Sequence, residues 1–283
     1  MILVTGAGGT IGAALIPELK TAKQPYRLAY HSEAKAERAR AAGEDAVALD
    51  FGKPDTLTPA LQGVDTVFLL GTGYMGQAEG EINVVRAARA AGVRKIVKLS
   101  VWGAENEAFS FAKVHRPVER EIEESGLAWT FLRANGFMQN VVNYMSGTIK
   151  ADGVFYSPSA DARISHIDAR DIARVAVLAL TSSAHDGKAY ALTGPEALSY
   201  VDVAATLSRV LGRTITYVPV PDEGARAGMI AGGIPDFYAD ALIDLNRFYR
   251  EGGASDVTTA VKDVTGREPV TFEQFVRDHA AAF

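Results

Sequence analysis

Hydrophobic and polar positions follow two alternating periods along the first half of the chain. Short apolar runs of strand type occur at residues 1–5, 26–30, 46–49, 64–70, 94–100 and 127–132. The segments between them carry apolar residues at helical spacing, and they predict helices at residues 10–22, 32–42, 79–91 and 113–125. Strands that alternate with helices of this length indicate βαβ units, a parallel sheet, and helices on both of its faces.

The pattern becomes less regular after about residue 150. Short strands are expected at residues 153–156, 163–167, 188–193 and 214–218. Helices are expected at residues 168–181 and 200–211, and over most of residues 221–283. With roughly 150 residues per domain as a guide, we predict an α/β domain over residues 1–150 and a smaller α+β lobe over residues 151–283. The strands predicted around residues 163–193 would return to the sheet of the first domain.

Composition and charge narrow the classes of function. Lysine and arginine number 29 against 34 acidic residues, so the net charge of −5 offers no cationic surplus for nucleic acid or anionic lipid. The chain has no cysteine, and its five histidines lack ligand spacing, so we predict no metal site. The longest uncharged runs are too short or too polar for a membrane span, and residues 1–17 make a poor signal peptide. A cytoplasmic protein is expected.

A glycine-rich turn joins the first predicted strand to the first predicted helix. Gly6, Gly9 and Gly12 stand at the spacing of a dinucleotide-binding loop. There Gly6 permits the tight turn, Gly9 lets the backbone approach a pyrophosphate, and Gly12 lets helix and sheet pack closely. The free N–H groups at the start of the helix would bind the phosphates. The turn therefore predicts a dinucleotide cofactor.

The end of the second strand bears on which dinucleotide is bound. A site for NAD usually places an acidic residue there to hold the ribose 2′-hydroxyl. This chain instead offers His31 and Ser32, with Lys35 one turn later. Hydrogen-bond donors and a cation suit a 2′-phosphate, although Glu33 would either turn outward or oppose it. NADP(H) is the preferred cofactor, with NAD(H) still open, and a merely solvated helix start is the alternative reading.

Further motifs lie at separated places along the chain. They are LQGVDTVFLL at 61–70, AAGVRKIVKLS at 90–100, SGLAWTFLR at 125–133, NGFMQN at 135–140 and ISHIDARDIA at 164–173. Together with the glycine turn, these segments resemble the NmrA-like branch of the atypical short-chain dehydrogenases. The similarity spans about residues 1–220 and weakens toward the C-terminus.

This resemblance implies a Rossmann-type, doubly wound parallel sheet that binds NADP(H), with a smaller C-terminal lobe forming the substrate cleft. Members of the family include reductases of quinones, of triphenylmethane and azo dyes, and of isoflavone-type compounds. Others are non-catalytic sensors that act through protein partners. The expected function is reduction of a flat conjugated small molecule by a monomer or homodimer, and the alternative is a redox sensor.

The resemblance also assigns cofactor contacts, grouped by the part of the cofactor that they would touch. The phosphates would contact Thr5, Gly6, Gly9, Thr10, Ile11 and Gly12, and the adenosine phosphate would contact His31, Ser32 and Lys35. Asp50 and Phe51 would flank the adenine, Leu70, Gly71 and Thr72 the ribose, and Ser100, Asn135 and Phe137 the nicotinamide.

The usual proton donor of short-chain dehydrogenases is missing. None of the ten tyrosines is followed by a lysine four residues later, which disfavours a sugar epimerase. In isoflavone-type relatives a lysine on the helix after the fifth strand replaces the tyrosine, and His115 falls on that position here. Either His115 donates the proton, or the acceptor disperses the incoming charge and needs no donor. A histidine on the helix surface is the simpler alternative.

Large apolar residues fall in loops at the carboxyl ends of the predicted strands, where open α/β sheets bind ligands. We expect Tyr74, Trp102, Phe109 and Met138 to line the substrate site, with ordinary core packing as the rival interpretation. Candidates for a lid over the cleft are Met229, Ile230, Phe237 and Tyr238, and His166 is expected to be structural.

Overall fold

A single seven-stranded sheet forms the centre of the molecule. The computed structural model describes residues 1–71 and 76–283. All neighbouring strands are parallel, and their order is β3-β2-β1-β4-β5-β6-β8. The strands are β1 (Ile2–Val4), β2 (Tyr26–Tyr30), β3 (Ala46–Ala48), β4 (Thr66–Leu69), β5 (Lys95–Val101), β6 (Ala128–Ala134) and β8 (Lys188–Leu192). This is the doubly wound Rossmann-type sheet that the sequence predicted.

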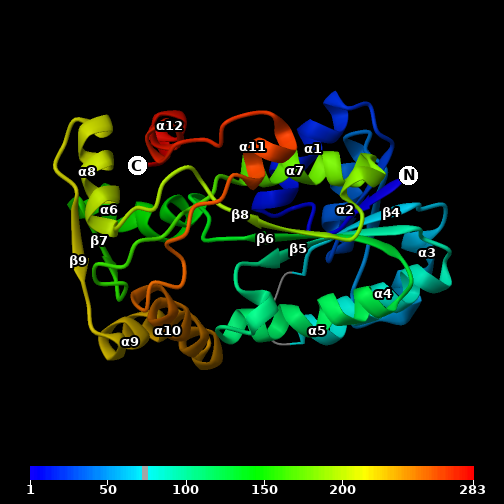
Figure 1. The fold of residues 1–283 in the computed structure, drawn as a ribbon, viewed down its shortest axis with the longest axis horizontal. Helices are drawn as coiled ribbons and strands as arrows, with labels where there is room; N and C mark the ends of the chain where they lie inside the picture. The colour runs from blue at the N-terminus through cyan, green and yellow to red at the C-terminus, as the bar shows by residue number, and fades with distance from the viewer. Residues whose placement is uncertain (72–75) are drawn as a thin grey trace.

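Helices cover both faces of the sheet (Figure 1). Alternate strand residues bury their side chains on opposite faces, so Val4 and Phe68 belong to one core cluster and Leu3 and Val67 to another. Helices α1 (Thr10–Thr21), α7 (Ala169–Thr181) and α11 (Ala260–Thr265) pack on the first face. Helices α3 (Pro54–Leu61), α4 (Gln77–Ala90) and α5 (Ser110–Glu124) pack on the second, and α2 (Glu33–Ala41) packs against β2 and β3.

The second lobe lies beside the carboxyl ends of the strands, at the left of Figure 1. Its core gathers large aromatic side chains, including Phe155, Phe272 and Phe275. A parallel pair of strands, β7 (Val154–Ser157) and β9 (Thr216–Pro219), forms a separate small sheet. Its helices are α6 (Ser146–Asp152), α8 (Tyr200–Leu211), α9 (Asp222–Ala231), α10 (Asp236–Arg250) and α12 (Phe272–Asp278), and a π-helical turn spans Val141–Met145.

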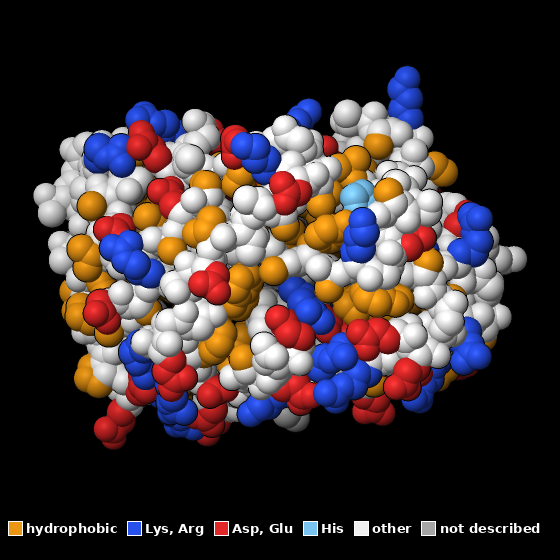
Figure 2. All heavy atoms as spheres, viewed as in Figure 1, with side chains coloured by type: hydrophobic (Ala, Val, Ile, Leu, Met, Phe, Trp, Pro, Cys, Tyr) orange, Lys and Arg blue, Asp and Glu red, His pale blue; other side chains and the backbone are white. Residues whose placement is uncertain are grey.

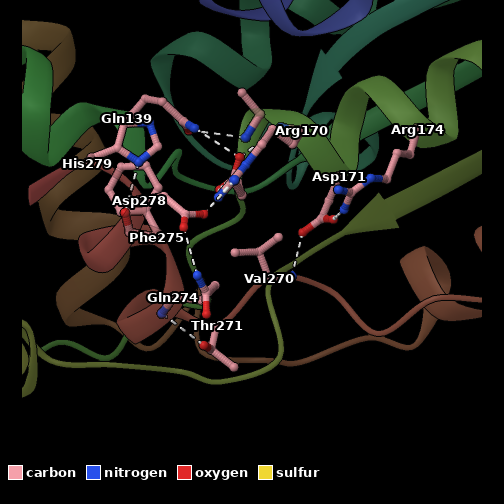
Figure 3. Close-up of polar contacts among 12 residues, drawn as sticks. Gln139, Arg170, Asp171, Arg174, Val270, Thr271, Gln274, Phe275, Asp278 and His279 are labelled. Atoms are coloured by element: carbon pink, nitrogen blue, oxygen red, sulfur yellow. Dashed lines mark hydrogen bonds and ion pairs between the residues drawn. The ribbon is translucent and has the colours of Figure 1, made fainter. Parts of the chain in front are cut away.

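A polar cluster fastens the C-terminal helix to the start of α7 (Figure 3). Asp168 caps α7 by accepting the N–H of Arg170 at 2.8 Å. The guanidinium of Arg170 contacts both Asp168 and Asp278 of α12, each at 2.6 Å. The amide of Gln139, from the segment after β6, donates to Asp168 at 3.0 Å. The cluster therefore joins α7, which packs on the sheet, to the segment after β6 and to α12.

The strand predicted at residues 163–167 is not formed. This segment makes only isolated bridges, from Ile164 to Leu198 and from Ile167 to Phe137. Its other backbone groups bond elsewhere, as when the N–H of Ser165 donates to Ala254 at 3.0 Å. The segment crosses from one lobe to the other, and contacts with both lobes replace a continuous ladder. β8 does join the large sheet beside β6.

The surface mixes charges of both signs. Over α10, α5 and α4, along the lower edge of Figure 2, basic and acidic side chains are intermingled. Examples are the pairs of Arg86 with Glu121 at 2.9 Å and of Arg226 with Asp240 at 2.6 Å. None of the helices in the described parts of the chain combines the length and apolarity needed to cross a bilayer.

Candidate active site

The glycine turn after β1 lies where the strand order of the sheet reverses. β1 pairs with β2 on one side and β4 on the other, so the turn opens at the switch point where such sheets bind ligands. Gly6 has φ +64°, a left-handed conformation that favours glycine. A Cβ on Gly12 would stand 2.6 Å from the carbonyl oxygens of Gly6 and Ala7. Only glycine lets α1 approach the turn so closely.

The N-terminus of α1 is free to bind an anion. Gly9 is its N-cap residue, no side chain caps the helix, and its first turn carries no acidic residue. The unpaired N–H groups and the helix dipole of such a terminus favour phosphate. Thr10 is half-buried and Ile11 is buried in the core below the turn. The backbone here has the form of a phosphate cradle.

Thr5 ties the ends of β1 and β4 together. Its buried hydroxyl accepts the N–H of Leu70 at 2.7 Å and lies 3.0 Å from the carbonyl oxygen of Phe68. These contacts engage the side chain within the protein and bring Leu70 against the glycine turn. Gly71 follows at the edge of the described segment, and the predicted contact Thr72 lies outside the described residues.

The predicted adenosine end is exposed and contains basic side chains. His31 and Lys35 are exposed, and Ser32 precedes α2 as its N-cap residue. Glu33 forms an ion pair with Arg40 of its own helix, so its charge is compensated within α2. The acidic residue that complicated the preference for a 2′-phosphate is thus paired.

Asp50 and Phe51 lie at the end of β3, near this basic group. Asp50 accepts the N–H of Gly52 at 3.0 Å and pairs with Lys53 at 3.2 Å. These hydrogen bonds lower the pKa of the Asp50 carboxyl, and the nearby His31 contributes to a lesser degree. Phe51 is half-buried, with its carbonyl accepting from Asn83 of α4 at 3.2 Å.

Ser100, predicted near the nicotinamide, faces α5. Its hydroxyl donates to Glu119 at 2.7 Å. Glu119 is fully buried and accepts two hydrogen bonds from Arg133, at 3.0 and 2.8 Å. Burial opposes the charge of Glu119, but the hydrogen bonds from Arg133 and Ser100 lower its pKa. Ser100 is therefore part of a satisfied network between β5, α5 and β6.

Asn135 joins the end of β6 to the second lobe. Its amide donates to the hydroxyl of Ser165 at 2.8 Å and to the carbonyl of Ala254 at 3.0 Å, and its oxygen accepts the N–H of Gly136 at 2.9 Å. Phe137 is half-buried against the sheet core. The side chain of Asn135 is thus occupied in holding the lobes together.

His115 lies in the second turn of α5 and is half-buried. Burial, and to a lesser extent the charge of Lys98, hold the pKa of its ring well below the usual range for histidine. Nε2 lies 3.4 Å from the amide nitrogen of Gln77, at the start of α4. Among the described residues Nδ1 has no hydrogen-bond partner. The ring is therefore neutral near pH 7, and it lies at the end of a series of hydrogen bonds that begins at Gln77.

The same series of hydrogen bonds includes two charged residues that were not predicted from the sequence, Lys98 and Glu81. Lys98 and Glu81 form a fully buried ion pair beside Gln77. The signal was present in the run RKIVKLS, where a second lysine interrupts a strand otherwise apolar on both faces. Among the described residues, no group of three or more histidine or acidic side chains is placed to hold a metal.

Two residues predicted to line the substrate site are buried in packing. Phe109 is 2% exposed and stacks on Phe248 with ring centroids 4.8 Å apart. Met138 is 1% exposed and belongs to the core of the second lobe. Both instead fit the core-packing alternative. Tyr74 lies outside the described residues.

Two other aromatic residues near the strand ends, Trp102 and Phe111, contact the second lobe. Trp102 is half-buried, and its indole N–H donates to the carbonyl of Gly253 at 2.7 Å. Phe111, one turn before His115 on the same face of the helix, meets Tyr238 of α10 edge to face at 5.5 Å. Phe237 beside it is 38% exposed. The aromatic wall next to His115 is thus made by α5 and α10.

Comparison with known proteins places the chain in a family. Residues 1–276 match the model of the NmrA-like family. The chain belongs to the NmrA-like family. An NmrA-like relative in the comparison, an NAD(P)H azoreductase of Xenophilus azovorans, is 39% identical over 284 residues, covering 100% of this chain and 99% of the relative.

Two solved structures share the NmrA-like fold closely. The NADPH-dependent quinone oxidoreductase QOR2 of Escherichia coli, complexed with NADPH, matches with a TM-score of 0.89 and 29% identity, over 99% of this chain and 100% of that one. The triphenylmethane reductase of Citrobacter, complexed with NADP(H), matches with a TM-score of 0.88 and 25% identity, over 98% and 99% of the two chains.

Proposed function

We propose that this chain is an NAD(P)H-dependent reductase that transfers hydride to a flat conjugated small molecule, such as a quinone, a dye, or a conjugated imine or enone. The glycine turn carries this proposal, because a Cβ at Gly12 would collide with two backbone carbonyls. That approach leaves the uncapped start of α1 open for a pyrophosphate. The relatives that reduce quinones, azo compounds and triphenylmethanes support the substrate class.

The residues fit NADP(H) better than NAD(H). Gly6, Gly9 and the N–H groups at the start of α1 would hold the phosphates, and His31 and Lys35 would contact the 2′-phosphate. The pairing of Glu33 with Arg40 supports this assignment, because it removes an unpaired anion from the phosphate's surroundings. When bound, the reduced nicotinamide supplies the hydride.

The chain's own contribution is mainly placement. Holding a donor and an acceptor in reacting geometry removes much of the entropic barrier without an acid. Phe111 and Tyr238 offer aromatic surface for a planar acceptor. His115 is the polar group beside that surface, and its low pKa makes it a neutral hydrogen-bond donor rather than an imidazolium acid.

The activity test is oxidation of NADPH by a panel of acceptors. The panel contains menadione, an azo dye, a cationic triphenylmethane dye and an enone, and the loss of reduced nicotinamide absorbance is followed. We expect turnover with at least one planar acceptor, and faster turnover with NADPH than with NADH. Tight cofactor binding without turnover on the whole panel would contradict the reductase and favour the redox sensor instead. The cytoplasmic location, the absence of nucleic-acid partners and the monomeric or homodimeric state stay predictions from the sequence.

A further inference from the structure

A buried ion pair links the middle of β5 to the first turns of α4. The Nζ of Lys98 contacts Oε2 of Glu81, and both side chains have zero exposure. Lys98 shares a strand face with Ile96, which belongs to the core cluster beneath α4 and α5. Desolvating two charges is costly unless the remaining hydrogen-bonding capacity is also satisfied. The second carboxylate oxygen of Glu81, Oε1, is also hydrogen-bonded, to two groups near the candidate active site.

Oε1 of Glu81 connects the ion pair to the candidate active site. It accepts the backbone N–H of Gly71 at 2.8 Å and the side-chain amide of Gln77 at 3.0 Å. Gly71 directly follows Leu70 at the carboxyl end of β4, and Gln77 begins α4. One carboxylate thus holds the residues on both sides of the connection between β4 and α4.

The ion pair with Lys98 determines which group donates and which accepts in each of these hydrogen bonds. A carboxylate paired with lysine only accepts, so Gln77 must turn its amide nitrogen toward Glu81. The same nitrogen lies 3.4 Å from Nε2 of His115 and can only donate to it. Nε2 of the neutral ring must then accept, which leaves the ring proton on Nδ1.

The surroundings of His115 agree with this tautomer. Its pKa is held low by burial and by Lys98, so the ring carries one proton near pH 7. Nδ1 is itself buried and has no hydrogen-bond partner in the described part of the chain. The Nδ1–H group is therefore not used by the protein segments that the structure describes.

We propose that Lys98, Glu81 and Gln77 are positioning residues that hold His115 as the tautomer protonated at Nδ1, and that this N–H donates a hydrogen bond to the acceptor during reduction. The proposal rests on the proposed function. Hydride transfer to one carbonyl oxygen of a quinone forms an O–H bond, breaks that carbonyl π-bond and shifts the electron pairs round the ring, so that the other oxygen becomes the anionic oxygen of a hydroquinone monoanion. The Nδ1–H group stabilises that anionic oxygen. That anion then takes one proton from water, leaving hydroxide, and His115 remains neutral throughout.

The tautomer can be measured without turnover. In protein labelled with ¹⁵N at histidine, one-bond coupling shows which ring nitrogen carries the proton, and a His115→Gln variant identifies the His115 signals. We expect wild-type His115 to be protonated at Nδ1. We expect a mixture of tautomers in Gln77→Met, where the donor to Nε2 is lost. Wild-type protonation at Nε2, or an unchanged tautomer in Gln77→Met, would overturn the proposal whatever the enzyme's activity.

A second variant removes the ion pair that makes Glu81 an acceptor. Breaking one member of the pair would leave a buried charge, so the double variant Lys98→Met with Glu81→Met removes both charges together. We expect its His115 tautomer to become mixed as well. The control is Arg86→Gln, which removes an exposed ion pair with Glu121 joining the same two helices and should leave the tautomer unchanged. A tautomer that shifts equally in the control would contradict the relay.

Kinetics separate positioning from general damage. With menadione, Gln77→Met should lower kcat by about tenfold or more, because His115 loses its donor. The KM for NADPH should stay within about twofold, because Glu81 loses the Gln77 amide but still accepts the N–H of Gly71. The double variant should also raise the KM for NADPH, because Gly71 loses its acceptor. A rise in KM without a fall in kcat for Gln77→Met would overturn the proposal. If the NMR results hold but no acceptor is turned over by the wild type, the proposed function fails and the tautomer relay stands.

Discussion

At the scale of single residues, the proposed chemistry depends on a histidine that is held in its neutral form. His115 lacks the basicity expected of a general acid near neutral pH, because burial and Lys98 disfavour its charged form. What it retains is a polarised N–H beside an aromatic wall. This arrangement suits acceptors that develop charge on an oxygen or nitrogen without needing immediate protonation.

Replacing His115 should therefore affect acceptors differently. His115→Ala is expected to lower kcat with menadione by a factor of about 100. A cationic triphenylmethane dye, which loses its charge on accepting hydride, should slow by less than about threefold under the same conditions. Steady-state rates with both acceptors measure the contrast. An effect below threefold on menadione would show that His115 does not assist reduction.

A second buried histidine, His166, makes the stability of the fold depend on pH. Burial lowers the pKa of His166 to about 4, whereas the unfolded chain would titrate near 6.5. Above pH 7 both states are neutral. As the pH falls from 6.5 toward 4 the unfolded state binds a proton that the folded state refuses, so the free energy of unfolding falls by up to about 3 kcal/mol. The folded protein thus loses stability on acidification.

This loss should shrink when His166 is replaced. Urea unfolding of wild type and His166→Gln at pH 7.5 and 4.5 gives the test. We expect the free energy of unfolding to drop by roughly 2 kcal/mol less in the variant, because carboxylates common to both proteins cancel in the comparison. Equal drops in the two proteins would mean that His166 binds its proton as readily when folded as when unfolded.

At the scale of elements, the proposed phosphate site depends on the close approach of α1 to the glycine turn. Gly12→Ala would place a methyl group 2.6 Å from two carbonyl oxygens of the turn and force the helix outward. We expect at least a tenfold weaker binding of NADPH and destabilisation by about 1–3 kcal/mol. Cofactor titration and urea unfolding measure the two effects.

The matched control for that change is Gly147→Ala. Gly147 lies in α6, where a Cβ meets no atom within 4 Å, so alanine should stabilise the helix slightly and leave NADPH binding unchanged. NADPH binding that survives Gly12→Ala intact would remove the geometric argument for the phosphate cradle.

Elements with a strong period were predictable from the sequence, and those set by tertiary contacts were not. The predicted strand at 26–30 and helix at 200–211 agree with β2 and α8. The apolar run at 163–167 was misassigned, because its hydrogen bonds go to two lobes rather than to one neighbouring strand. The helix α3 was not predicted, since prolines at its first and sixth positions obscure its period.

The same division holds for the site. Local spacing predicted the glycine turn, because glycine spacing itself dictates the backbone. Spacing could not reveal that Glu81, 17 residues before Lys98, would meet it in the core. Nor could it show that Phe109 would be covered by Phe248, since that contact depends on how the second lobe docks.

At the scale of the whole molecule, the second lobe is held against the strand ends by a few specific contacts. Trp102 and Asn135 at the ends of β5 and β6 both donate to carbonyls of the 253–254 segment. Arg170 reaches Asp278 of α12 on the other side. These contacts position α10 over α5, where the aromatic wall forms.

Trp102→Phe should loosen this arrangement without removing the aromatic ring. The carbonyl of Gly253 loses its donor, and we expect a loss of about 1–2 kcal/mol in stability together with a raised KM for the acceptor. Urea unfolding and acceptor titration measure both. Trp129→Phe is the control, because that ring stacks on Phe131 at 4.2 Å within the sheet domain and should not change KM. A KM that rises equally in both variants would contradict the role of the 253–254 segment.

The whole account depends on a nucleotide bound at the start of α1. The most direct measurement is calorimetric titration of the wild-type chain with NADPH and with NADH, without an acceptor present. The account predicts saturable binding at one site per chain, tighter for NADPH than for NADH. Absence of binding by both nucleotides would contradict it.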